Sequence, residues 1–186
     1  MKNDNKNTIV KNHYTEQEIV AACLEDDRKM QKVLYDKYCD AMFTTSYRIL
    51  SDFEIANDSL QEAFLKVFLN LKKFRGESTL GAWIKKIVVR TALKRLKKEK
   101  LFVPLDESHI ELLVSIPNDY KSDYLEKAVF ELPDGFRTIF VMIEIEGYSH
   151  KEVADFLSIS ESTSRSQLFH AKRRLREKIL KMRNSV

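Results

Sequence analysis

The chain has 186 residues, with 44% apolar and 32% charged side chains and a formal net charge of +4. This length allows one ordinary domain or two small ones, and the apolar content is sufficient for a core. No apolar run approaches the ~20 residues of a membrane span, and the polar N-terminal residues lack the apolar stretch of a signal peptide. We therefore exclude membrane insertion and expect a soluble protein of the cytoplasm.

The first half of the chain predicts four helices and no strand. Thr15 followed by Glu18 is a capping-box pattern, which predicts the start of a short helix. Apolar residues at helical spacing predict a second helix over about 34–49. Ser51 followed by Glu54 repeats the capping pattern and predicts the start of the third helix there.

The third helix has two different faces. One face is a continuous apolar stripe, which predicts burial: Ala56, Leu60, Ala63, Phe64, Val67, Phe68 and Leu71. The other face places leucines beside polar side chains: Asp58, Gln61, Glu62, Leu65 and Leu69. Exposed leucines among polar groups are typical of a docking surface. The alternative is that Leu65 and Leu69 pack on the N-terminal helix.

A polar loop and a basic helix follow. The loop over residues 73–79 combines Phe74 with Arg, Ser and Thr side chains. The helix after it buries Trp83 on one face and carries a row of cations on the opposite face: Lys86, Arg90, Lys94 and Lys97. A loop of this kind suits an unstacked base, with the cations on the phosphates. The alternative is a solvated charged face without a ligand.

Charge is unevenly distributed along the sequence. Residues 85–100 carry eight Lys or Arg against one Glu, and residues 165–183 also carry eight against one. Between them, residues 101–120 carry four acidic residues and no basic one, and Pro104 and Pro117 there indicate a linker. Two basic blocks on either side of an acidic linker predict two separate contacts with a polyanion.

The last third of the chain predicts two helices, over about 124–132 and 133–146, and then a helix-turn-helix. Ser149 with Glu152 predicts the start of its first helix, and Ser160 can cap the second. The second helix has an apolar stripe: Leu168, Ala171, Leu175 and Ile179. A helix-turn-helix presents its second helix to the major groove of DNA.

Several side chains of this second helix are left for solvent or DNA: Ser162, Thr163, Arg165, Ser166 and His170. Two positions depart from the usual helix-turn-helix pattern. Ser158 stands where a turn glycine is common, and Ser164 stands where a buried aliphatic residue is expected. The alternative is an amphipathic helical hairpin with a solvated basic face.

Enzyme motifs are missing from the sequence. Gly76 and Gly81 have the spacing of a phosphate-binding loop, but Ala-Trp follows in place of Lys-Ser/Thr. No general base is paired with a nucleophile. Cys23 and Cys39 are isolated, so neither a metal site nor a disulfide framework is indicated. We expect no catalytic residues, no metal and no cofactor; a small nuclease is the remote alternative.

Several of these segments together resemble the extracytoplasmic-function group of bacterial sigma factors, the subunits that give RNA polymerase its promoter specificity. Residues 58–65 (DSLQEAFL) resemble the region 2 signature that docks on the polymerase clamp. Residues 74–77 (FRGE) and 83–87 (WIKKI) resemble the loop and helix that melt and read the minus-ten element. Leu132-Pro133, followed by Phe136-Arg137 and the helix-turn-helix, resembles region 4, which reads the minus-thirty-five element.

The resemblance implies a role for each group of residues. The core-polymerase contacts would be Asp58, Gln61, Glu62 and Leu65. The opened minus-ten strand would be bound by Phe74, Arg75, Glu77, Ser78, Thr79, Lys86, Arg90, Lys94 and Lys97. The minus-thirty-five element would be contacted by Ser162, Thr163, Arg165, Ser166, His170 and Lys172. Arg90 and Lys94 stand where many members carry Asn and Asp, a departure that bears on minus-ten specificity.

We therefore expect an all-α protein with two small helical domains joined by an acidic linker. The expected segments are a disordered N-terminus (1–14), a region 2-like domain (15–100), the linker (101–121) and a region 4-like domain (122–182). The expected partners are the RNA polymerase core, promoter DNA and an anti-sigma factor, and the free protein is expected to be a monomer. A helix-turn-helix regulator that acts without polymerase is the alternative function.

Overall fold

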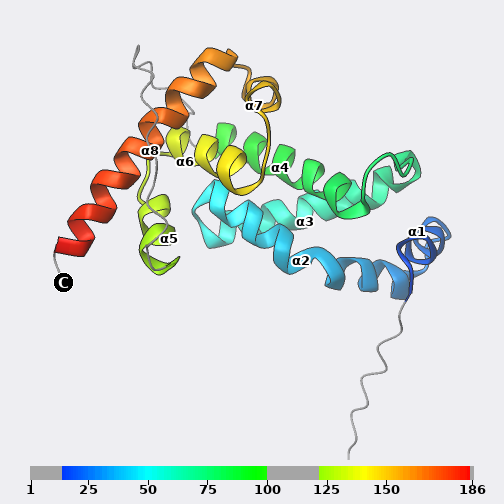
Figure 1. The fold of residues 1–186 in the computed structure, drawn as a ribbon. Helices are drawn as coiled ribbons and strands as arrows, with labels where there is room; N and C mark the ends of the chain where they lie inside the picture. Colours follow the sequence, from blue (N-terminus) through cyan, green and yellow to red (C-terminus); the bar gives the residue numbers. More distant parts are fainter. Residues whose placement is uncertain (1–13, 100–121, 185–186) are drawn as a thin grey trace, which may run out of the picture.

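The computed structural model consists of helices, and it describes residues 14–99 and 122–184 (Figure 1). In that part of the chain no strand occurs and no helix is long and apolar enough to cross a membrane. The predicted linker lies outside the described residues, as does the predicted N-terminal segment up to residue 13. The α-helices are α1 (Glu16–Leu24), α2 (Arg28–Leu50), α3 (Phe53–Asn70), α4 (Leu80–Glu99), α5 (Ser122–Phe130), α6 (Asp134–Phe140), α7 (His150–Leu157) and α8 (Glu161–Asn184). Two other helical turns are the 3-10 helix η1 (Leu71–Lys73) and the π-helix η2 (Val141–Ile145).

Side-chain caps start the helices of the first half. Thr15 forms the predicted capping box with Glu18 at the start of α1. The predicted cap at Ser51 is wrong by one residue. Ser51 ends α2 in the left-handed conformation, with φ 56°, and Asp52 caps α3 by accepting a hydrogen bond from the Ile55 amide at 2.9 Å. The Ser-x-x-Glu pattern was misleading because Asp52, an equally good N-cap residue, follows directly, while Ser51 ends α2.

Helices α2, α3 and α4 pack against one another, and α1 packs on α2. The apolar stripe of α3 faces inward as predicted, with Ala63 and Val67 fully buried. The start of α4 approaches α2 closely at Gly81, where a Cβ atom would lie 3.1 Å from the Tyr38 ring. Tyr38 in turn donates a hydrogen bond to Glu16 at 2.6 Å, which fastens α1 to α2.

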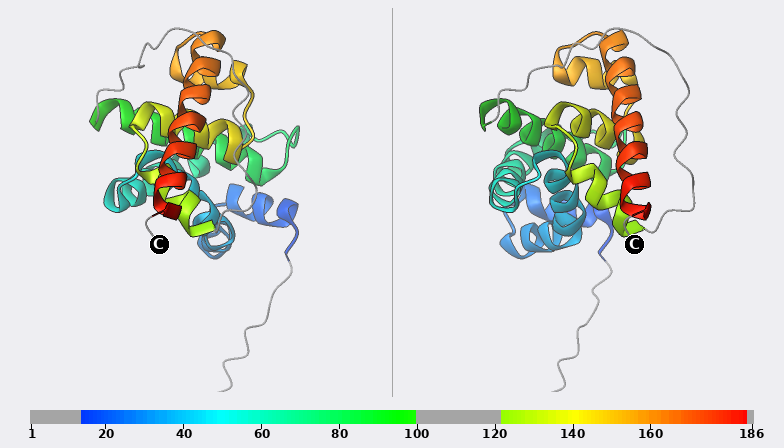
Figure 2. Two further views of the ribbon diagram at one scale, coloured as in Figure 1. Left: turned by 60° about the vertical axis from the view of Figure 1, so that its left-hand side comes forward. Right: turned by 90° about the vertical axis from the view of Figure 1, so that its left-hand side faces the viewer.

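Helices α5 to α8 form a second group in which α8 packs on α5, α6 and α7 (Figure 2). The predicted apolar stripe of α8 is buried throughout: Leu168, Ala171, Leu175 and Ile179. The helix predicted over 133–146 is interrupted, because α6 widens into the π-helix η2. Pro133 caps α6 and is not its first helical residue, and Gly147, with φ 77°, follows the end of η2.

The two groups of helices share a hydrophobic core. Helix α6 packs on α2, and α7 approaches α4 (Figure 1). Buried side chains from both groups belong to one cluster, among them Ile49, Val89, Leu93, Phe136, Ile139 and Met142. Arg137 is only 3% exposed and donates a hydrogen bond across the boundary to the Ile49 carbonyl at 3.4 Å. The sequence left open whether the two groups pack together, and in this structure they do.

Candidate nucleic-acid interface

The outer face of α3 exposes large apolar side chains to solvent. Leu65 is 65% and Leu69 is 74% exposed, so the alternative that they pack on the N-terminal helix is wrong. Glu62 pairs with Lys66 at 2.7 Å, and this hydrogen bond holds the pKa of the Glu62 carboxyl below its usual value. The structure brings the predicted docking residues together on α3: Asp58, Gln61, Glu62 and Leu65.

The loop between α3 and α4 is polar and ends in a helix cap. The Thr79 hydroxyl accepts a hydrogen bond from the Ala82 amide at 3.2 Å. The Phe74 ring turns inward, with its centroid 5.6 Å from that of Trp83. Gly76 has φ 73°, a conformation that glycine adopts without strain. The remaining predicted loop residues are exposed: Arg75, Glu77 and Ser78.

A cleft of about 380 Å³ lies between α3 and α4. Its lining combines a flat aromatic wall with hydrogen-bonding groups and cations, namely Lys66, Asn70, Trp83, Arg90, Thr91 and Lys94. Aromatic surfaces beside cations are features of single-stranded nucleic-acid sites. Lys66 and Asn70 of α3, Lys73 of η1 and Thr91 of α4 were not predicted as site residues, and the two α3 residues meet the cation row only when α3 packs on α4. The prediction that Trp83 lies on the face opposite the cations is wrong, because Trp83 lines this cleft together with Arg90 and Lys94.

The row of cations on α4 is exposed as predicted: Lys86, Arg90, Lys94 and Lys97. Two of these side chains contact α7. The Arg90 guanidinium lies 5.4 Å from the centroid of the Phe156 ring, and Lys97 donates a hydrogen bond to the Leu157 carbonyl at 3.3 Å. The basic face of α4 is therefore partly covered by the helix-turn-helix.

Helices α7 and α8 form the predicted helix-turn-helix. Ser149 forms a capping box with Glu152 at the start of α7. The Ser160 hydroxyl caps α8 by accepting a hydrogen bond from the Thr163 amide at 3.0 Å. In the turn, Ser158 adopts the left-handed conformation, with φ 59°, that glycine would adopt more easily. The turn therefore keeps its usual geometry without a glycine.

A polar contact joins the two helices of the motif. Ser164 is fully buried, and its hydroxyl lies 2.9 Å from Nδ1 of His150. This pair explains the serine at a position where an aliphatic residue was expected. Burial, and then the nearby charge of Arg165, lowers the pKa of His150, so the neutral ring is favoured at this contact.

The residues predicted to face DNA differ in exposure. Ser162 and Arg165 are exposed, and Thr163 and Ser166 are partly exposed. Arg165 pairs with Glu161 at 2.9 Å, within the first turn of α8. These side chains form a short polar strip at the N-terminal end of the helix.

The assignment of His170 to the DNA-facing set needs correction. His170 is only 7% exposed, and its ring packs 5.3 Å from Phe169 and 6.2 Å from Phe136. Its spacing along α8 places it off the apolar stripe, and packing of α6 against α8 buries its ring. Lys172 is half-buried and pairs with Glu144 at 2.8 Å.

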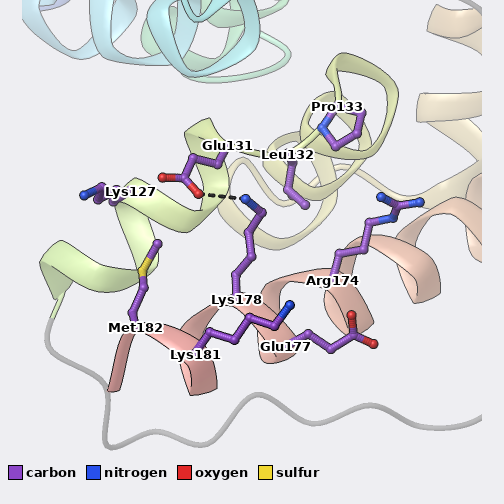
Figure 3. Close-up of a pocket in the computed structure, with 9 residues that line it drawn as sticks. All are labelled: Lys127, Glu131, Leu132, Pro133, Arg174, Glu177, Lys178, Lys181 and Met182. Atoms are coloured by element: carbon purple, nitrogen blue, oxygen red, sulfur yellow. Dashed lines mark hydrogen bonds and ion pairs between the residues drawn. The ribbon is translucent and has the colours of Figure 1, made fainter. Parts of the chain in front are cut away.

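A second groove of about 750 Å³ lies between α5 and α8 (Figure 3). Lys178 reaches across it to Glu131 at 2.7 Å, and this hydrogen bond lowers the pKa of the Glu131 carboxyl. Leu132 and Met182 add apolar surface to its lining. The groove lies along the later turns of α8, away from the exposed polar strip at its start.

Comparison with known proteins assigns the family. The family model described as Sigma-70 region 2 matches residues 34–102, and the model described as Sigma-70, region 4 matches residues 122–175. The ECF RNA polymerase sigma-E factor of Haemophilus influenzae is 27% identical over 181 residues, covering 89% of this chain and 95% of that protein. The RNA polymerase sigma factor SigV of Bacillus subtilis is 31% identical over 127 residues, covering 68% and 76%. The chain belongs to the extracytoplasmic-function group of the sigma-70 family.

A solved structure supports the fold of this sigma factor. The sigma factor RpoE of Bartonella quintana, solved in complex with the anti-sigma factor NepR, superposes with a TM-score of 0.54 at 23% identity. The match covers 81% of this chain and 96% of that one. The region 2 match contains α3 and α4, and the region 4 match contains α5 to α7 and much of α8.

Family membership decides between the functions that the sequence left open. This sigma factor directs RNA polymerase to promoters in transcription initiation and is not an enzyme. A regulator independent of polymerase and a small nuclease are excluded, because both sigma regions are matched. Across residues 14–99 and 122–184, no cluster of His, Cys, Asp and Glu could hold a metal ion.

Proposed function

We propose that three surfaces of this sigma factor bind three different partners. The outer face of α3 docks on the polymerase core, the α3–α4 cleft with its loop binds the opened minus-ten strand, and the start of α8 contacts the minus-thirty-five element. The observation that carries the proposal is the cleft, where the Trp83 ring, against which Phe74 of the loop packs, meets hydrogen-bonding groups and cations. None of these groups would be needed for docking alone.

In the proposed minus-ten site, one unstacked base enters the cleft beside Trp83. Aromatic stacking holds any of the bases, and the hydrogen-bonding amide of Asn70 adds selectivity. Lys86, Lys94 and Lys97 contact phosphates along the strand. Arg90 lies at the cleft and on the basic face of α4, and can reach either a base or a phosphate.

In the proposed minus-thirty-five site, Ser162, Thr163, Arg165 and Ser166 face the major groove from the first turns of α8. The N-terminal residues of the second helix are those that reach base edges in helix-turn-helix proteins. Lys172 is proposed as a phosphate contact that exchanges Glu144 for DNA. His170 is left out of this set because its ring is buried.

We expect the protein to act in the cytoplasm, to be a monomer when free, and to be held inactive by an anti-sigma factor that contacts both helical regions. The acidic linker is proposed to run through polymerase near the transcript path, where its charge would resemble that of nucleic acid. The domain limits proposed for these roles are 15–100 and 122–182.

Reconstitution with core RNA polymerase tests the proposed surfaces. Promoter fragments from a sequence library are transcribed with this sigma factor, and start sites are mapped. We expect defined starts that share two upstream elements. Starts that share no sequence at the minus-ten position would contradict the role given to the cleft.

The docking face is tested by Glu62→Lys. This change reverses a charge beside the exposed Leu65, so we predict at least tenfold weaker binding to core polymerase, or ~1.4 kcal/mol. Asp36→Lys is the matched control, because it makes the same change of charge on α2, likewise breaks an i,i+4 pair with a lysine, and lies outside all three proposed surfaces. Binding is measured by fluorescence anisotropy of the labelled sigma factor. Equal weakening by both changes would show that overall charge, and not the α3 face, governs docking.

A further inference from the structure

Region 4 covers part of the basic face of α4. Helix α7 lies against α4 (Figure 1). There Lys97 donates a hydrogen bond to the Leu157 carbonyl, and the Arg90 guanidinium lies over the Phe156 ring. Both cations belong to the proposed minus-ten site. Both side chains remain exposed beside α7, so a promoter strand that used them would compete with these two contacts.

An ion pair with a buried carboxylate adds to the shared hydrophobic core at the turn before α7. One oxygen of Glu146 lies 2.8 Å from Lys85 of α4, and the other accepts a hydrogen bond from the Thr45 hydroxyl of α2 at 3.0 Å. The Glu146 side chain is only 5% exposed. A carboxylate withdrawn from water in this way is costly without partners, and here both partners belong to region 2.

The backbone of η2 directs Glu146 toward region 2. The Glu146 amide donates to the Val141 carbonyl at 2.9 Å, which is the wide hydrogen bond of a π-helix. Glu144, two residues earlier, pairs with Lys172 of α8 at 2.8 Å. Glu144 therefore pairs within region 4, whereas Glu146 pairs with residues of region 2.

We infer that Glu146 is an intramolecular latch, which holds region 4 over the basic face of α4 in the free protein. Promoter binding requires Glu146 to release Lys85 and Thr45 so that α7 can leave α4. The inhibitory effect of this latch rests on the minus-ten site proposed above. The closed packing does not depend on that proposal. It gives the sigma factor a closed state of its own, without another protein.

Charge exchange tests the latch without polymerase or DNA. Glu146→Lys and Lys85→Glu each place like charges against one another, and the double variant restores an opposite pair. We expect a larger radius of gyration in small-angle X-ray scattering for each single variant, and the wild-type value for the double variant. Glu131→Lys is the matched control, because it breaks a similarly short ion pair inside region 4. Unchanged radii in both single variants, with helices intact by circular dichroism, would overturn the latch.

Binding to single-stranded DNA tests what the latch covers. The probe is a fluorescein-labelled, mixed-sequence single strand, and Glu146→Gln is compared with wild type because this change keeps the shape of the side chain. We expect about tenfold tighter binding, with no such gain for Glu131→Gln, which removes the same charge elsewhere. Equal gains in both variants would overturn the inhibitory role. No DNA binding by any variant, despite opening in scattering, would refute the minus-ten site and leave the closed state supported.

Discussion

At the residue scale, His150 makes the helix-turn-helix sensitive to pH. Its pKa is lowered, chiefly by burial, so the folded state favours the neutral ring beside Ser164. The unfolded chain then binds the proton more readily, and the stability from this site is complete only above the unfolded value of ~6.5. It is lost as pH falls from there through the lowered pKa. We predict that Tm falls between pH 7 and pH 5, measured by circular dichroism.

The control for this prediction is His150→Asn, which keeps a polar group near Ser164 but does not titrate. Its Tm should change less over the same range. Carboxylates act in the same direction only at lower pH, for example Glu152, whose pKa is lowered by hydrogen bonds with Ser149. An unchanged pH dependence in His150→Asn would assign the effect to another group.

Gly81 sets the distance between α4 and α2. An added Cβ atom would lie 3.1 Å from the Tyr38 ring, which its hydrogen bond to Glu16 keeps in place. We predict that Gly81→Ala lowers the free energy of unfolding by ~1 kcal/mol, because the contact outweighs the better helix propensity of alanine. Urea denaturation measures the change. In a Tyr38→Leu background the same change should be neutral or stabilising, and a loss there would point to a different cause.

At the element scale, the turn of the helix-turn-helix carries avoidable strain. Ser158 is non-glycine, exposed and left-handed, with φ 59°. We predict that Ser158→Gly raises the free energy of unfolding by ~0.5–1 kcal/mol, because glycine adopts this conformation without steric cost. Chemical denaturation measures the gain. Ser162→Gly is the control, since it lies inside α8, where glycine should destabilise by a similar amount. Loss of stability in both variants would contradict the strain argument.

Helix positions and caps could be predicted from the sequence because they depend on neighbours along the chain. Thr15, Ser149 and Ser160 are caps in the structure as predicted, and the stripe of α8 is buried, as is that of α3 apart from the half-buried Phe68. The π-helix η2 could not be predicted, since it keeps the same apolar spacing as an α-helix for several residues. The buried Ser164 departs from the apolar pattern of a helix-turn-helix because it pairs with His150, a contact that the sequence does not show.

At the scale of the whole molecule, contacts between distant segments account for what the sequence could not show. The apolar faces of α4 and α6 are equally consistent with two separate cores, and only the structure shows that they share one. The cations of the α3–α4 cleft that form a row along α4 could be predicted. Lys66 could not, because it comes from another helix. The contacts of Glu146 with Lys85 and Thr45 also join residues far apart in the chain.

The two basic blocks, residues 85–100 and 165–183, predict how the affinity of the holoenzyme for a promoter fragment depends on salt. Each phosphate contact releases a counterion, so the slope of log K against log salt changes by ~0.9 per contact on duplex and ~0.7 on single strands. Lys94→Gln in the first block should reduce the slope by about the single-strand amount, and Arg165→Gln in the second by about the duplex amount if it contacts phosphate. The double variant should show the sum, because distant sites act independently. Lys32→Gln, which lies in neither block and pairs with Asp36, is the control and should leave the slope unchanged.

A different outcome is expected if Lys94 or Arg165 reads a base. Its variant would then lose affinity for some sequences only, with the slope intact.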